Sequence, residues 1–217
     1  RFLFNNKNSR LILQNKDDLG YFLKNKLVNI DNVAIIRGSG VDIKKFIPAE
    51  ESAGIPIVML ASRMLWDKGV GEFVEAAKIL KQEGIEARFV LVGENDSENP
   101  ASISNSQLNE WNELDTVEWW GEKTDMHKVL VQSSIVCLPS YREGLPKVLL
   151  EATSCGRPII ATDVPGCREI VHNGENGILV PLKNSIALAS AIKELINNHE
   201  KRKSMGMNGR RLVESEF

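Results

Sequence analysis

The chain has 217 residues, of which 42% are hydrophobic and 26% are charged, a balance that is ordinary for a globular domain and excludes extensive disorder. A chain of this length buries about 70% of its unfolded surface, so it needs no disulfide or metal to hold a core. With 27 basic and 29 acidic residues, the formal net charge is -2. This near balance of charge excludes a broad positively charged surface for binding nucleic acid, so any phosphate site must be local.

The apolar runs are too short to cross a membrane, because a spanning helix requires roughly 18 consecutive apolar residues. No signal-peptide pattern precedes them. Three cysteines, Cys137, Cys155 and Cys167, form no CxxC pair and are odd in number, which is typical of a reducing compartment. We therefore expect a cytoplasmic protein without a transmembrane segment, in which the cysteines are packing residues.

The N-terminal segment differs in character from the rest of the chain. The strand-like runs SRLILQ (9–14) and VAIIRG (33–38) flank the helix-like DDLGYFLKN (17–25), and a stretch rich in glycine, proline and acidic residues follows. We expect residues 1–50 to be the remnant of a preceding domain plus a linker, and residues 51–217 to form the main domain. Since the sequence begins at Arg1 without a methionine, we expect a fragment of a longer protein.

Six short apolar runs with turn residues at their ends follow, separated by helical patterns. They lie at 57–61, 88–93, 117–121, 135–140, 158–163 and 177–181. Between the first two, apolar residues at helical spacing predict an amphipathic helix that ends at Gly84. Strands that are apolar throughout and alternate with helices predict an α/β fold with a doubly wound, Rossmann-like parallel sheet. Two helices at 184–198 and 199–216 complete the prediction, the first capped by Asn184 or Ser185.

Ligands of such sheets bind beyond the carboxyl ends of the strands, so the loops that follow the strands are the places to search. The loop SRMLWDKG (62–69) carries Arg63 and Lys68 just before a predicted helix, whose free backbone N–H groups favour an anion. Two cations beside these N–H groups suggest a phosphate site. Considered alone, the loop is better explained by solvated cations paired with Asp67 or Glu72.

Two glutamates stand eight positions apart in the loop and helix that follow the fourth predicted strand. Pro146 suits the first turn of that helix, so Glu143 lies in the preceding loop and Glu151 more than one turn inside. A carboxylate accepts two hydrogen bonds and therefore matches the vicinal hydroxyls of a ribose or hexose. The backbone of 144–148 could meet a phosphate or sugar oxygen. Taken singly, each glutamate is explained equally well as a solvated side chain on a polar face.

Other nucleotide and metal motifs are absent from the sequence. No GxGxxG follows the first strand of a βαβ unit, and no GxxxxGK[ST] occurs. His127, His172 and His199 lack metal-ligand spacing, so we predict no protein metal site. The loop GEKTDM (121–126) is a candidate wall for a nucleotide base, whereas the tryptophans before it are more simply packing residues.

With these residues assembled, the sequence resembles the C-terminal, donor-binding half of the family 4 retaining glycosyltransferases of GT-B architecture. The resemblance runs from VAIIRGSGVDIKKF (33–46) to the helix near Arg211, and its most specific part is the glutamate pair of EGLPKVLLEA (143–152). Within this family, the sequence is similar to bacterial enzymes that build surface polysaccharides or lipid-linked oligosaccharides. One difference is VGENDSEN (92–99), where many relatives have a glycine-rich turn.

The resemblance implies a role for each matched residue. Arg63 and Lys68 would hold the donor diphosphate, Glu143 the hydroxyls of the transferred sugar and Glu151 the ribose, and Arg63, Lys68 and Glu143 would take part in catalysis. The backbone of the intervening segment would assist, through Gly144, Leu145, Pro146, Lys147 and Val148. The family retains the anomeric configuration and needs neither metal nor another cofactor, because the cations neutralise the leaving group.

The resemblance also implies the substrates. The donor would be a nucleoside-diphosphate sugar, with a UDP-hexose or UDP-N-acetylhexosamine expected, and the acceptor a glycan, polysaccharide or lipid-linked sugar held by an N-terminal domain. Residues 1–50 would be the end of that acceptor domain, and this chain alone would be inactive. No nucleic-acid partner is expected, and the longer protein could meet the inner face of a membrane peripherally. A nucleotide-sugar epimerase of the same fold and a non-catalytic nucleotide-sugar binding module stay open, because fold does not determine substrate.

Overall fold

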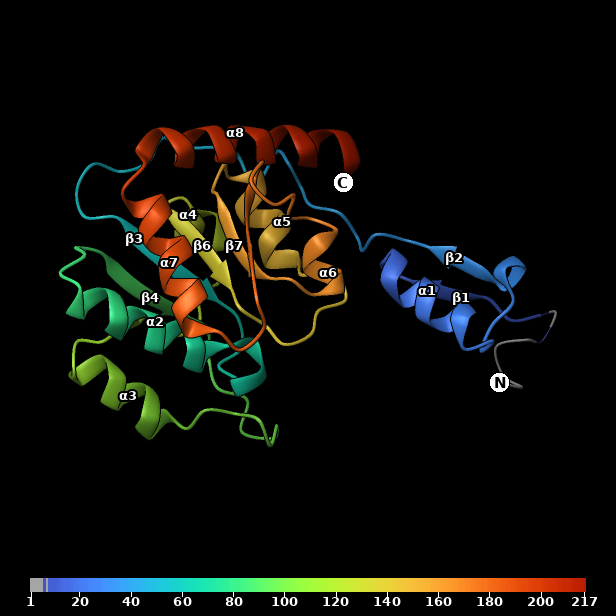
Figure 1. The fold of residues 1–217 in the computed structure, drawn as a ribbon, viewed down its shortest axis with the longest axis horizontal. Coiled ribbons are helices and arrows are strands. Elements are labelled where there is room, and N and C mark those ends of the chain that lie inside the picture. The colour runs from blue at the N-terminus through green and yellow to red at the C-terminus, as the bar shows by residue number, and fades with distance from the viewer. Residues whose placement is uncertain (1–5, 7) are drawn as a thin grey trace.

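The computed structural model describes residue 6 and residues 8–217, which form a large α/β unit and a smaller N-terminal unit. Figure 1 shows the larger unit as a sheet with helices on both faces, and the N-terminal unit to one side of it. An extended segment joins the two. Among the described residues, no helix is both long and apolar enough to span a bilayer.

The central sheet has six strands in the order β5-β4-β3-β6-β7-β8, and every neighbouring pair is parallel. The strands are β3 (Ile57–Ala61), β4 (Arg88–Val92), β5 (Glu118–Trp119), β6 (Ile135–Leu138), β7 (Ile159–Thr162) and β8 (Gly177–Val180). The strand order reverses between β3 and β6, where Leu60 is in register with Cys137. The predicted doubly wound parallel sheet is therefore confirmed.

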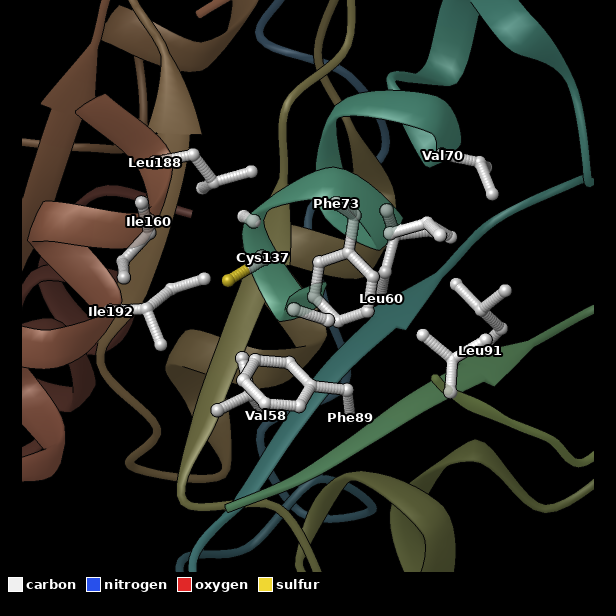
Figure 2. Close-up of a cluster of buried hydrophobic side chains, with 14 of the residues drawn as sticks. Val58, Leu60, Val70, Phe73, Phe89, Leu91, Cys137, Ile160, Leu188 and Ile192 are labelled. Atoms are coloured by element: carbon white, nitrogen blue, oxygen red, sulfur yellow. The ribbon is translucent and has the colours of Figure 1, made fainter. Parts of the chain in front are cut away.

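Alternate residues of each central strand supply the two faces of the core. Val58 and Leu60 of β3 point to the face covered by α2 (Val70–Gln82), α3 (Asn105–Glu113) and α7 (Ser185–Ile196). Figure 2 shows this cluster, with Phe73 of α2 close to β3 and β4 and the leucine and isoleucine side chains of α7 beside β7. Met59 points to the opposite face, which is covered by α4 (Met126–Leu130) and α5 (Lys147–Ser154). Burial on both faces explains why these strands are apolar throughout.

Several element ends differ from the sequence prediction. The third strand, β5, has two residues rather than five, and α3 was not predicted, although Ser104 caps it by accepting a hydrogen bond from Gln107 N. Pro146 is the N-cap residue of α5 rather than part of its first turn. Of the two candidate caps for α7, Asn184 is the one used, through its bond from Ala187 N. The predicted end of α2 is correct, since Gly84 adopts a left-handed φ of 72° immediately after the C-cap residue Glu83.

The last helices enclose the unit. Helix α8 (His199–Glu216) packs on α5 and places Met205 and Val213 in the core.

All three cysteines are buried and free of disulfides, as expected of packing residues. Burial raises the pKa of the Cys155 and Cys167 thiols to about 12.

The N-terminal unit consists of β1 (Leu11–Leu13), α1 (Lys16–Lys24), a 3-10 turn at Ile30–Asn32 and β2 (Val33–Ile35). Its two strands pair in parallel and form a sheet of their own. The start of α1 lies against α6 (Pro165–Arg168), where Asp17 and Arg168 form a 2.9 Å ion pair. The following segment belongs to the larger unit in its packing, because Phe46 is buried in the second core cluster.

Candidate functional site

The loops that follow β3 and β6 meet at the carboxyl edge of the sheet, at the point where the strand order reverses. Open α/β sheets bind their ligands in this crevice. The two loops approach closely at Gly69, whose φ is 73° and where an added Cβ would lie 2.1 Å from the carbonyl oxygen of Pro139. Tyr141 joins them further, because its N–H donates to Asp67 O at 2.8 Å and its hydroxyl donates to Glu72 at 2.6 Å.

An ion pair spans the two loops. Lys68, in the 3-10 turn Trp66–Lys68, lies 2.7 Å from Glu143 Oε1, and the two side chains are 21% and 11% exposed. The structure therefore pairs Lys68 with the glutamate predicted for the transferred sugar, and not with the nearby acids Asp67 or Glu72. This places one predicted phosphate ligand directly beside one predicted sugar ligand.

A cavity of about 460 Å³ opens at the same edge, beyond β3 and β4. Its lining includes Arg63 from the loop after β3, Val148 and Glu151 from α5, and Glu122 and Lys123 from the loop after β5. The loop GEKTDM thus forms a wall of this cavity, and contact of this wall with a nucleotide base stays a prediction. Three segments far apart in the chain therefore converge on a volume within the range of small-molecule sites.

Glu151 is the most buried acidic residue of this cavity, with 8% of its surface exposed. Burial raises its pKa, and the ammonium of Lys147, 3.6 Å from Oε1, acts in the opposite direction. Because a carboxylate offers about four lone-pair sites, Glu151 keeps the capacity to accept hydrogen bonds from a ligand.

Arg63 is 61% exposed and forms a 2.7 Å ion pair with Asp96. Asp96 belongs to the acidic segment VGENDSEN, and Glu94, Asn95 and Asp96 all line the cavity. The segment can approach because Gly93 has a φ of 133° and an added Cβ would lie 1.9 Å from Ser62 O. The acidic segment therefore supplies a partner for a predicted phosphate ligand, which sequence reasoning did not foresee.

The segment between the two glutamates is only partly directed at the cavity. Val148 lines it, whereas Gly144, Leu145, Pro146 and Lys147 do not, and neither do Lys68 and Glu143. Leu145 instead packs in the third core cluster.

The loop at Gly144 is held from two sides. Asn15, which is fully buried, donates from Nδ2 to Gly144 O at 3.3 Å. Gly166 allows α6 to approach from the other side, since its added Cβ would lie 2.4 Å from Gly144 O.

The tryptophans and histidines near the site have other partners. The indole N–H of Trp119 donates to Gly93 O at 2.8 Å, and that of Trp120 donates to Glu118 at 3.0 Å. The His127 ring nitrogen Nε2 lies 3.0 Å from Ile47 O. In the part of the chain that the structure describes, no three His, Cys, Asp or Glu side chains are grouped so as to hold a metal ion.

Comparison with known proteins identifies the family. The family model described as "Glycosyl transferases group 1" matches residues 42–212. The chain belongs to this glycosyltransferase family, as its sequence resemblance indicated.

Two curated relatives act on lipid-linked sugars according to their names. The chain is 34% identical over 200 residues to the Campylobacter jejuni N,N'-diacetylbacillosaminyl-diphospho-undecaprenol alpha-1,3-N-acetylgalactosaminyltransferase, covering 86% of the chain and 51% of the relative. It is 27% identical to the Escherichia coli UDP-Gal:alpha-D-GlcNAc-diphosphoundecaprenol alpha-1,3-galactosyltransferase, covering 85% of the chain and 50% of the relative. The chain thus spans about half the length of these relatives.

Solved structures share the fold. Anabaena HepE in complex with UDP superimposes with a TM-score of 0.81 at 22% identity, over 96% of this chain and 60% of HepE. The C-terminal domain of a group 1 glycosyl transferase from Francisella tularensis superimposes with a TM-score of 0.67 at 24% identity, over 82% of this chain and 98% of that domain. The larger unit therefore has the fold of one half of a GT-B glycosyltransferase.

Proposed function

We propose that the cavity at the carboxyl edge binds a nucleoside-diphosphate sugar, and that the whole protein transfers this sugar with retention of configuration. The observation that carries the proposal is that Arg63, from the loop after β3, and Glu151, from α5, line one cavity beside the point where the strand order reverses. A cation and a buried carboxylate in one cavity match the two ends of a nucleoside diphosphate, its phosphates and its ribose hydroxyls.

The remaining residues extend the donor site past the cavity. Lys68 joins Arg63 on the diphosphate, and Glu143 accepts hydrogen bonds from the hydroxyls of the transferred sugar. The 2.7 Å contact between Lys68 and Glu143 supports these neighbouring roles. The backbone of residues 144–148 lies between the two glutamates and assists at the phosphates or the sugar. Glu151 accepts the ribose hydroxyls.

In the proposed reaction, the acceptor hydroxyl oxygen forms a bond to the anomeric carbon as the bond from that carbon to the diphosphate oxygen breaks, and the hydroxyl proton passes to the departing diphosphate. The acceptor attacks the face that the diphosphate leaves, and configuration is retained. Negative charge grows on the leaving diphosphate, where Arg63 and Lys68 stabilise it, and the loss of one such donor costs about 2.7–4 kcal/mol in a well-studied hydrolase. The two cations neutralise the leaving group without a metal or another cofactor.

UDP is the proposed nucleotide and a hexose or N-acetylhexosamine the proposed sugar. The names of the two curated relatives support this choice, since one includes UDP-Gal and the other an N-acetylgalactosaminyl group. Both names also include a diphosphoundecaprenol acceptor, which supports a lipid-linked or polysaccharide acceptor for this protein. Such an acceptor would place the whole protein in the cytoplasm, at the inner face of the membrane.

Residues 1–50 are proposed to be the end of the acceptor-binding domain and the linker to it. Their two-stranded sheet is too small to be stable alone, and Ile12, Tyr21, Ile35 and Ile36 are exposed on this unit. Exposed apolar side chains on so small a sheet are expected where further strands and helices cover it. We therefore expect the 217-residue chain to bind donor and to lack transfer activity.

The test is a calorimetric titration of the chain with UDP, GDP and ADP in excess chelator. We expect UDP to bind without metal, and ligand at 100 times its Kd to stabilise the fold by roughly 2.7 kcal/mol, a melting shift of a few degrees. If none of the diphosphates binds, or if binding requires a divalent metal, the proposed donor site is wrong.

Transfer is tested on the longer protein. Incubated with UDP-sugars and a diphospholipid-linked sugar acceptor, it should form a glycoside whose anomeric configuration, read by NMR, equals that of the donor. An epimerised nucleotide sugar formed without acceptor would assign the protein to the epimerases, and donor binding with no product would assign it to the non-catalytic modules.

A further inference from the structure

A second cavity, of about 700 Å³, lies at the opposite edge of the sheet from the candidate donor site. Its walls are the segment 48–51, the residues just before β6 and β7, and one side of α8. Ser134 and Pro158, which line it, precede their strands, so the cavity faces the amino ends of β6 and β7. It therefore shares no residue with the cavity that holds Arg63 and Glu151.

The charged residues that line this second cavity are mostly basic. Its cations are Arg157, Arg202, Lys203, Arg210 and Arg211, and its acids are Glu50 and Glu51. Arg202 forms an ion pair with Glu51 at 2.8 Å, and Arg210 forms one with Glu214 at 2.6 Å. Within residues 6 and 8–217, the other three cations have no carboxylate within 4.0 Å, and the exposed Glu50 can balance only one of them. An excess of positive charge therefore faces the cavity.

Arg157 is the deepest of these cations, with 4% of its surface exposed. Its Nη2 donates to Ala49 O at 2.9 Å and to Val131 O at 2.8 Å, while its Nε–H has no hydrogen-bond partner among the described residues. Burial lowers its pKa. A buried charge without a counter-ion is costly, and so is a buried N–H without an acceptor. An anion in the cavity would offset the cost of the buried charge.

The geometry points to a phosphate-binding site here, and we propose that the cavity takes a phosphate or pyrophosphate group, either free or in a lipid headgroup. Arg157 provides the buried guanidinium, whose fork of N–H donors suits phosphate oxygens. Lys203 and Arg211, both exposed on α8, provide charge at the rim. The site is separate from the donor cavity, so it stands or fails independently of the proposed function.

The first experiment is calorimetric titration with inorganic phosphate and with pyrophosphate. It uses the chain carrying Arg63→Ala and Lys68→Ala, which removes the two cations that could bind these anions at the donor site. We expect saturable binding that weakens at least about fivefold when Lys203→Gln and Arg211→Gln are added. The matched control adds Lys78→Gln and Lys193→Gln instead, removing the same charge from α2 and α7, and should bind as tightly as the background.

A second arm distinguishes the source of the phosphate by co-sedimentation with phosphatidylglycerol or phosphatidylcholine vesicles. Binding to phosphatidylglycerol vesicles without binding of soluble phosphate, lost on Lys203→Gln with Arg211→Gln, assigns the site to a lipid headgroup. Binding of the soluble anions without the vesicles assigns it to a free phosphate compound. The proposal is overturned if neither probe binds, or if the rim variant binds as tightly as its control.

The buried guanidinium is tested by Arg157→Lys, which keeps the charge and removes the fork of N–H donors. If the variant keeps the circular dichroism spectrum of the unaltered chain, it should bind phosphate more weakly. Unchanged affinity in the folded variant would remove Arg157 from the site and leave the rim cations as its only ligands.

Discussion

Lys68 and Glu143, which are 75 residues apart in sequence, form a 2.7 Å ion pair at the point where the strand order reverses. The pair connects the loop after β3 to the loop after β6, and both of its members are proposed donor ligands. In the free protein each side chain holds the other in position. This arrangement preorganises a site whose functional groups would otherwise be mobile loop side chains.

Loss of Lys68 should destabilise the fold more than loss of an equally close surface lysine. Glu143 is 11% exposed in the intact protein and loses its partner in Lys68→Ala, and an unsatisfied buried partner costs about 1–3 kcal/mol. Lys193→Ala breaks a pair of the same 2.7 Å length whose side chains are 45% and 44% exposed, which should cost less than about 1 kcal/mol. Urea denaturation measures both, and equal losses would mean that the Lys68–Glu143 pair is solvated.

Removing the charge of Asp96 should tighten UDP binding. Asp96 holds Arg63 in a 2.7 Å pair, so the proposed phosphate ligand must exchange a carboxylate for the diphosphate. An exposed pair is worth about 0.2–1 kcal/mol, so Asp96→Asn should lower the Kd for UDP up to about fivefold.

The same substitution in an Arg63→Ala background is its control. In that background, Asp96→Asn should change the Kd for UDP little, because Arg63 is absent and Asp96 no longer competes with the diphosphate for it. If Asp96→Asn weakens UDP binding in the chain that keeps Arg63, then Asp96 orients the arginine for the donor and does not compete with it.

Two glycines with the same backbone conformation should differ in their tolerance of a side chain. Gly69 and Gly84 have φ values of 73° and 72°, but an added Cβ meets Pro139 O at 2.1 Å in the first and nothing within 4 Å in the second. Gly84→Ala should cost only the left-handed strain, about 1–2 kcal/mol. Gly69→Ala adds a steric clash and should exceed about 3 kcal/mol. Comparable losses in thermal unfolding would show that the loops after β3 and β6 can separate freely.

Stability should depend on pH in opposite ways at two glutamates. Burial raises the pKa of Glu151 above its usual 4.5, so the folded state holds this proton more tightly, and stability is lost as pH rises through the raised value. Glu151→Gln should therefore gain stability relative to the unaltered chain as pH rises from about 4 to 8.

Glu118 provides the matched comparison for this pH dependence. Its hydrogen bonds from Arg88 lower its pKa, so its contribution to stability is present above 4.5 and is lost as pH falls. Glu118→Gln should consequently lose stability relative to the unaltered chain as pH rises over the same range. Urea denaturation measures the stability of both variants at each pH. If the two stabilities change in the same direction with pH, burial is not the cause of the raised pKa of Glu151.

Sequence patterns were sufficient to predict most strands and several helices of the main domain. The six strands were predicted because they are buried on both faces, which makes them apolar throughout, and α2 was predicted because one of its faces is buried. Helix α3 was missed because only Leu108 and Trp111 are buried in it, so its periodic signal is weak. The third strand was predicted too long, since only Glu118 and Trp119 pair with β4.

The sequence indicated candidate site residues but not their partners. Arg63, Lys68, Glu143 and Glu151 are candidates from loop position and family resemblance, yet local sequence suggested Asp67 or Glu72 as the partner of Lys68. The actual partner, Glu143, is brought near by the adjacency of β3 and β6, and Asp96 is brought to Arg63 by the adjacency of β3 and β4. Such contacts follow from strand order, which short-range patterns do not encode.

The affinity of the chain for UDP, measured calorimetrically in excess chelator for three proteins, tests the donor site most directly. These are the unaltered chain, Glu151→Ala, and Glu113→Ala, a control that removes an exposed carboxylate from α3. A hydrogen bond to a charged group is worth about 1.5–3 kcal/mol, so Glu151→Ala should weaken UDP binding about tenfold or more. Glu113→Ala should leave it unchanged. If Glu151→Ala binds UDP as tightly as the unaltered chain, the cavity beside β3 and β4 does not hold the ribose of the donor.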